Sequence, residues 1–370
     1  MEQLRFVARS VDAQEATFTM SGIIGHTMYA ILAAKAAAHR RLPVASLIGR
    51  HWASYLAGSY LGCDIMTMPE AICVDTGKEV GYGTVPLEKS PLTGGPVRPY
   101  QLAFENHSYR PREIYEIFYG RAHLTFGWTR QQQDLVLPWD HLPDYCTAVV
   151  EDALRLFGPG ERPLAYVLGW MTHLVGDGLI KSIWPGVTLH LLDGKYTPRN
   201  RPLQDLFTYH EIGCKELQLN WPAMFADLAE TPVEPIQLHY MRATTPRGRL
   251  AEDFSDGWMP GRESLLRAVL LKNRQYLATY NQQTLHEMEL RRTADGWQCR
   301  EELRQATGGL SYAHMVEAAE KAHFRHALWQ IAEAIAELFT QVAYLAPGIR
   351  QMPVGDGPTW AELTRRWKMS

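Results

Sequence analysis

The sequence is poor in cysteine, and its few cysteines form no recognisable pattern. Only five occur in 370 residues, and they are widely separated. They are Cys63, Cys73, Cys146, Cys214 and Cys299. A disulfide framework needs a denser set, and a thiolate zinc cluster needs pairs with C-x-x-C spacing, which no two of these residues have. The sequence therefore indicates neither of these two kinds of protein.

The sequence also lacks an export signal and a long uncharged apolar stretch. Its first residues, MEQLRFVARSVDAQEA, do not combine a basic start with a continuous apolar run. The most apolar segment, 163–184, contains His173, Asp177 and Lys181, so it reads as a buried helix and not as a membrane span. We therefore expect a cytoplasmic protein without a transmembrane segment.

Strong charge of either sign is missing as well. The formal net charge is −3 and the pI is near 6.5, which provides no general attraction to nucleic acids or anionic membranes. At the same time 46% of the residues are hydrophobic. A chain of this size and composition can bury a large core, as a folded enzyme does.

Helical patterns dominate what is present, and alternating strand patterns are scarce, so we expect an all-α fold. The expected helical segments are 22–41, 51–66, 112–119, 142–157, 163–183, 202–228, 263–292 and 311–345. Proline and glycine predict long irregular loops near 67–112 and 239–262. We expect residues 1–235 to form a metal-binding helical core that contains the first loop. Residues 236–370 would form a helical extension packed on that core.

Two polar residues interrupt the apolar segment 163–184. His173 and Asp177 are four residues apart, so they stack on one face of a helix. A buried carboxylate needs compensation, and a divalent metal bound by both side chains would supply it. The alternative is that Asp177 pairs with Lys181 while His173 donates to a backbone carbonyl. The spacing alone leaves both interpretations open.

The neighbouring residues resemble a known family. The stretch LAYVLGWMTHLVGDGLIKSIW is similar to the signature helix of the zinc-dependent phospholipase C family, which includes bacterial phospholipases C and fungal single-strand nucleases. Three further elements follow the family order: His26 in GIIGHTMYAILAAKAA, Asp64 in GSYLGCDI, and His107 in AFENHSYRP. The resemblance covers roughly residues 20–215. It implies an all-α, multi-helix bundle of the phospholipase C and single-strand nuclease type.

The resemblance also implies a metal site. Its first zinc would be held by Asp64, His107, His173 and Asp177. Asp177 would also bridge to a second zinc with help from His26. The candidate ligands are His26, Asp64, His107, His173, Asp177, His190, His210 and Glu211. The family's His-xxx-Glu helix is altered here, since Cys214 stands four residues after His210. We therefore expect one to three Zn²⁺ ions.

The function implied by the resemblance is zinc-dependent hydrolysis of a small-molecule or lipid phosphoester. A zinc ion would activate water, and Asp64 would act as a ligand and general base. Arg98, Arg110 and Arg112 lie close to His107 in the sequence and are candidates for binding the substrate phosphate. The alternatives are a one-metal hydrolase or lyase with another substrate, and a non-catalytic scaffold stabilised by metal. The C-terminal amphipathic helix could also form a homo-oligomer.

Overall fold

A computed structural model shows a mainly helical protein, with three small β-sheets among the residues that it describes. It describes residues 22–60, 69–80, 87–91, 93–104, 107–110, 139–157, 161–180, 200–230 and 281–345. The α-helices are α1 (Ile23–His39), α2 (Pro43–Arg50), α3 (Trp52–Tyr60), α5 (Leu142–Phe157), α6 (Glu161–Ile180), α7 (Asn200–Phe207), α8 (Trp221–Glu230), α12 (Glu301–Ala306), α13 (Tyr312–Lys321) and α14 (Phe324–Leu345). To these are added the 3-10 turn η4 (Trp139–His141), the π-helix η5 (Thr208–Glu216) and a helical segment at 281–287. The strands are β1 (Ala71–Cys73), β2 (Glu79–Val80), β3 (Val97–Pro99), β4 (Leu102–Phe104), β5 (His107–Tyr109), β6 (Arg291–Thr293) and β7 (Gly296–Gln298).

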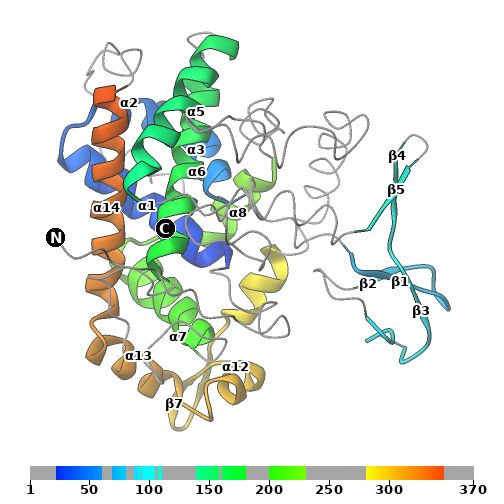
Figure 1. The fold of residues 1–370 in the computed structure, drawn as a ribbon. Coiled ribbons are helices and arrows are strands. Elements are labelled where there is room, and N and C mark those ends of the chain that lie inside the picture. The colour runs from blue at the N-terminus through cyan, green and yellow to red at the C-terminus, as the bar shows by residue number, and fades with distance from the viewer. Residues whose placement is uncertain are drawn as a thin grey trace, which may run out of the picture.

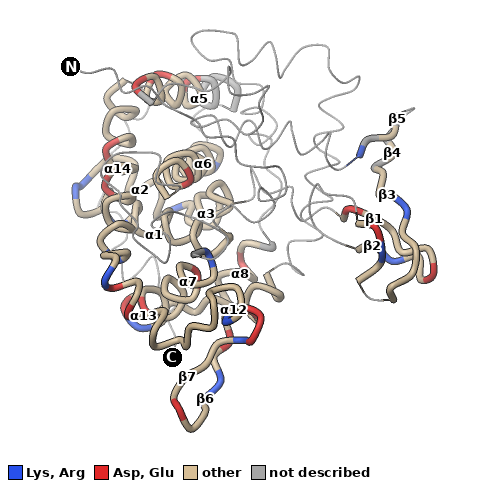
Figure 2. The backbone as a smooth tube through the Cα atoms, turned by 60° about the horizontal axis from the view of Figure 1, so that its bottom comes forward, with Lys and Arg blue, Asp and Glu red and all other residues tan. Residues whose placement is uncertain are grey.

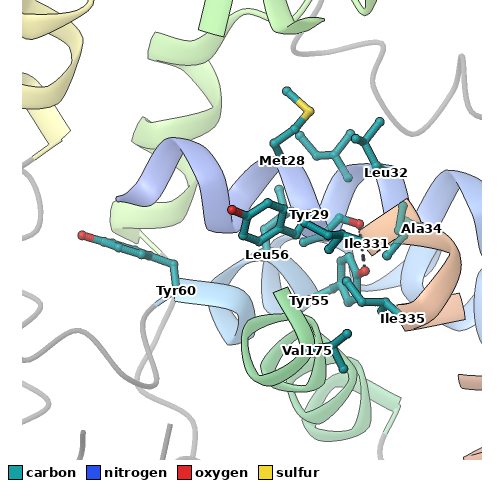
Figure 3. Close-up of a cluster of buried hydrophobic side chains, with 14 of the residues drawn as sticks. Met28, Tyr29, Leu32, Ala34, Tyr55, Leu56, Tyr60, Val175, Ile331 and Ile335 are labelled. Carbon is teal, nitrogen blue, oxygen red and sulfur yellow. Dashed lines mark hydrogen bonds between the residues drawn. The ribbon is translucent and has the colours of Figure 1, made fainter. Parts of the chain in front are cut away.

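Helix α6 lies at the centre of the helical body, packed against α1, α3 and α14 (Figure 1). Its residues from Leu164 to Ile180 are all buried, and Asp177 is the only charged residue among them. A helix that is apolar on all sides has to be surrounded by other helices. Figure 3 shows how Tyr29, Leu56 and Ile331 from the surrounding helices meet Val175 of α6 in one apolar cluster. The C-terminal helix α14 thus belongs to the same core as α1.

Tyr55 of α3 ties this core together with a buried hydrogen bond. Its hydroxyl donates to the carbonyl oxygen of Ala30 in α1 over 2.8 Å (Figure 3). The side chain is fully buried, and burial raises the pKa of Tyr55 well above its ordinary value. The phenol therefore remains a neutral donor between the two helices.

We expect Tyr55→Phe to lower the free energy of unfolding by about 1 to 2 kcal/mol, because it removes one buried hydrogen bond and leaves the ring in place. Chemical denaturation monitored by circular dichroism measures this loss. The matched control is Tyr344→Phe, since Tyr344 is 72% exposed. A Tyr55→Phe variant as stable as this control would contradict the assigned role of the hydroxyl.

The small sheets correct the expectation that segment 67–112 is irregular, while the mainly helical fold stays compatible with the expected all-α class. Strands β2, β1 and β3 form one antiparallel sheet in that order, β4 pairs with β5, and β6 pairs with β7. Strands β1 to β5 stand to one side of the helical body in both views (Figures 1 and 2). The first sheet has its own small cluster, formed by Ala71, Cys73 and Val80. Strands of two or three residues are too short to show a period-2 pattern, which explains the error.

Two expected helices also differ from the prediction, since one ends early and the other is divided. Instead of one helix over 263–292, the helical segment ends at 287 and the β6–β7 hairpin follows. Ala294 and Asp295 form the turn of this hairpin, and Gly296, with φ +108°, is the first residue of β7. The expected helix 311–345 is divided into α13 and α14 at His323, whose φ of +54° is incompatible with a continuous α-helix.

The mainly helical character is confirmed, and the expected helix 142–157 agrees with α5. Within the ranges given above, none of the helices combines the length and apolar character needed to cross a membrane. The expected boundary near residue 235 and the loop 239–262 lie outside the described residues. The division of the chain into two parts therefore stays a prediction.

Candidate metal centre

Helices α1 and α6 bring together a buried group of two histidines and one aspartate. His26 lies in the first turn of α1, and His173 and Asp177 face it from α6. All three side chains are buried. The Nε2 atom of His26 lies 3.6 Å from Oδ1 of Asp177, and the Nε2 atom of His173 lies 3.8 Å from Oδ2. One ligand atom from each residue can be chosen so that all three lie within 4.8 Å of one another.

These separations suit a shared metal ion. Two ligands of a tetrahedral zinc site lie about 3.3 Å apart when each bond is about 2.0 Å. The two nitrogen–oxygen distances, 3.6 and 3.8 Å, are closer to that spacing than to a normal charge-assisted hydrogen bond. Imidazole nitrogen and carboxylate oxygen are also donors that zinc accepts. The buried group could therefore hold a metal ion after a small closing movement.

A backbone carbonyl orients His173. Its Nδ1 atom lies 3.2 Å from the carbonyl oxygen of Ser59, at the end of α3. Because a carbonyl only accepts, Nδ1 carries the proton and donates it. The Nε2 atom then faces Asp177 and is the nitrogen that could bind a metal ion when the ring is neutral. Histidine ligands of metals are commonly oriented in this way by a second hydrogen bond.

The two histidine rings also restrict the charge of the group. The rings of His26 and His173 are stacked, with centroids 3.9 Å apart and an interplanar angle of 23°. Two imidazolium ions in this contact would repel each other strongly in a buried environment. At least one ring is therefore neutral, which is the form that binds metals.

Glycines decide how closely the three helices approach at this point. A Cβ atom on Gly58 of α3 would lie 2.0 Å from the carbonyl oxygen of Tyr166, and one on Gly169 of α6 would lie 1.8 Å from that of Tyr55. The two backbones therefore touch, which places the Ser59 carbonyl beside His173. Similarly, a Cβ on Gly176 would lie 2.3 Å from the ring of Tyr29 in α1. These glycines belong to the motifs of the sequence resemblance, and their role here is close packing.

His210 and Glu211 lie in the π-helix η5 and have other partners. The Nε2 atom of His210 donates to the carbonyl of Met288 over 2.7 Å, and burial lowers the pKa of His210. Glu211 accepts hydrogen bonds from Lys215 and Tyr312. Burial alone would raise the pKa of Glu211, but these two donors bring it below its ordinary value. Neither residue is part of the group of ligand atoms around Asp177.

The remaining candidates are not brought to this group by the described part of the chain. Asp64, His190, Arg112 and Lys181 lie outside the described residues, and for His107 only the backbone, at the start of β5, is described. Arg98 in β3 and Arg110 after β5 are exposed, on strands that stand apart from α1 and α6 (Figures 1 and 2). Their roles as ligands or phosphate-binding residues stay predictions.

The alternative interpretation of the sequence included a backbone carbonyl as the partner of His173, but it did not identify that carbonyl as the one of Ser59. A backbone carbonyl has no residue-type signature, so Ser59 was visible only as part of the motif that contains Gly58. Comparisons with known proteins add no further site residues. No protein-family model, no curated protein and no solved structure matches this chain.

Proposed function

We propose that this protein is a metal-dependent hydrolase of phosphoesters, with His26, His173 and Asp177 as zinc ligands. The observation that carries the proposal is that His26 meets the His173–Asp177 pair in a buried group. The sequence resemblance to zinc-dependent phospholipases C selects the same three residues as ligands and suggests both the zinc and the phosphoester. The finer fold assignment, a bundle of the phospholipase C and single-strand nuclease type, is part of this proposal.

The chain's own residues prepare the site in three ways. Asp177 provides a negative charge, while Ser59 holds the proton of His173 on the nitrogen that points away from Asp177. Burial within α1, α3 and α6 excludes bulk water and strengthens each electrostatic interaction in the site. A zinc ion bound here would supply Lewis acidity for hydrolysis at a phosphorus centre.

A one-metal enzyme with different chemistry is the second candidate. In the described part of the chain only three ligands converge, and His210 and Glu211 are engaged elsewhere. The first zinc site implied by the resemblance needs Asp64 and His107 in addition. If these do not reach the group, a single metal would serve another hydrolase or lyase reaction or only stabilise the bundle.

Metal stoichiometry separates these functions. We expect plasma mass spectrometry on protein purified without a histidine tag to find at least two zinc ions per chain. We also expect hydrolysis of a chromogenic phosphodiester, lost on chelation and restored by zinc. One ion without this activity would favour the second candidate. A protein that takes up no metal after incubation with zinc would overturn the proposal.

A further inference from the structure

Two turns of the first sheet share the same backbone pattern. They are residues 73–78, between β1 and β2, and residues 90–95, before β3. In each turn the N–H of the first residue donates to the carbonyl of the sixth, over 2.8 and 3.0 Å. The N–H of the fifth residue donates to the carbonyl of the first, over 2.8 Å in both. The fifth residues, Gly77 and Gly94, have φ values of +66° and +68°, which favour glycine.

The side chains at the first and fourth positions follow the same pattern. The N–H of the sixth residue donates to the hydroxyl of the fourth, Thr76 in one turn and Thr93 in the other, over 3.3 and 3.2 Å. The N–H of the fourth residue donates to the side chain of the first, which is Cys73 or Ser90. The two turns are thus equivalent in five features, although their sequences, CVDTGK and SPLTGG, share little.

The three hydroxyl side chains converge on the sulfur of Cys73, which is buried in the small cluster of this sheet. Sγ of Cys73 lies 3.6 Å from Oγ1 of Thr93. Hydrogen bonds from Thr76 first, then from Thr93 and Ser90, lower the pKa of Cys73 to about 6. Asp75 links the turns further, because its Oδ2 atom lies 3.4 Å from Oγ1 of Thr93.

This arrangement matches the construction of a common zinc site. Zinc ribbons bind the metal with two C-x-x-C turns, whose thiolates occupy the first and fourth positions of each turn. Here the spacing is Cys73-x-x-Thr76, then residues 77–89, then Ser90-x-x-Thr93. We propose that the two turns are a metal-free counterpart of a four-thiolate zinc site, with Cys73 at one ligand position and three hydroxyls at the others.

One thiolate and three neutral hydroxyls are not a donor set that zinc accepts, so hydrogen bonds replace the metal in holding the turns. The sheet should therefore withstand chelation, and zinc found in the natural protein should not depend on Cys73. This inference is independent of the function proposed for the helical site.

The test introduces cysteines at the three hydroxyl positions. We expect the full-length variant T76C/S90C/T93C to bind one more metal ion than the natural protein. With Co²⁺ it should show thiolate-to-cobalt charge-transfer bands and the visible bands of tetrahedral cobalt. Adding Cys73→Ala to this variant should weaken both sets of bands. In the natural protein, Cys73→Ala should leave the zinc content unchanged and remove a thiolate that titrates near pH 6 in ultraviolet absorbance.

The double variant T76C/T93C guards against misfolding of the triple variant. It retains Ser90 and should still show thiolate-to-cobalt bands from three cysteines. The proposal is overturned if neither variant shows these bands while the double variant keeps the circular dichroism of the natural protein. It is equally overturned if Cys73→Ala alone removes zinc from the natural protein.

Discussion

Asp177→Asn should remove most of the bound metal while the helices remain folded. The substitution keeps the size of the side chain but removes the only negative charge in the buried group. Loss of a partner that merely orients a ligand costs about 10- to 100-fold in metal affinity, so loss of a ligand should cost at least about 100-fold. Plasma mass spectrometry after dialysis measures the remaining metal, and circular dichroism measures the helices.

A thermal shift provides a second reading of the same prediction. Zinc present at about 100 times its dissociation constant should stabilise the natural protein by about 2.7 kcal/mol, and this gain should vanish in Asp177→Asn. The control is Asp144→Asn, which neutralises an exposed carboxylate in the first turn of α5. It should keep both the metal and the thermal shift. Full metal content in Asp177→Asn would refute the assignment of the site.

Gly169→Ala should cause the largest loss of stability among the glycine substitutions. The new Cβ would lie 1.8 Å from the carbonyl oxygen of Tyr55 and 3.0 Å from the nitrogen of Ser59, so it meets only backbone atoms. Helices α3 and α6 would have to separate, and overpacking of this kind costs roughly 3 kcal/mol or more. Because the Ser59 carbonyl moves with α3, metal affinity should fall as well. Urea denaturation and metal titration measure the two effects.

Gly176→Ala is the comparison that tests this mechanism. Its Cβ would meet the ring of Tyr29 at 2.3 Å. Unlike a backbone atom, this ring can be removed by a second substitution. Tyr29→Ala should therefore recover part of the stability lost in Gly176→Ala. No such truncation can help Gly169→Ala, where the obstacle is the backbone. If Gly169→Ala is as stable to urea as the natural protein, the close contact of α3 and α6 is not what positions the site.

Local patterns predicted most of the helical segments because the spacing of apolar residues recurs over several turns of each helix. The apolar run around His173 and Asp177 predicted a buried helix, and α6 is buried from Leu164 to Ile180. The spacing of four residues placed both side chains on one face. The strands β1 to β5 were missed because two or three residues are too few for a repeat.

The candidate site, too, was predicted in part from local sequence and decided in part by contacts between distant segments. The sequence by itself determined that His173 and Asp177 share a buried helical face, because that depends only on the helical period and on the apolar neighbours. Which groups surround the pair depends on contacts between distant segments. The approach of His26 and of the Ser59 carbonyl was decided by the tertiary structure, where glycines allow α1 and α3 to touch α6. Likewise, only the folded turns bring Cys73 to three hydroxyls. The sequence did not indicate this group, because it contains no second cysteine at C-x-x-C spacing from Cys73.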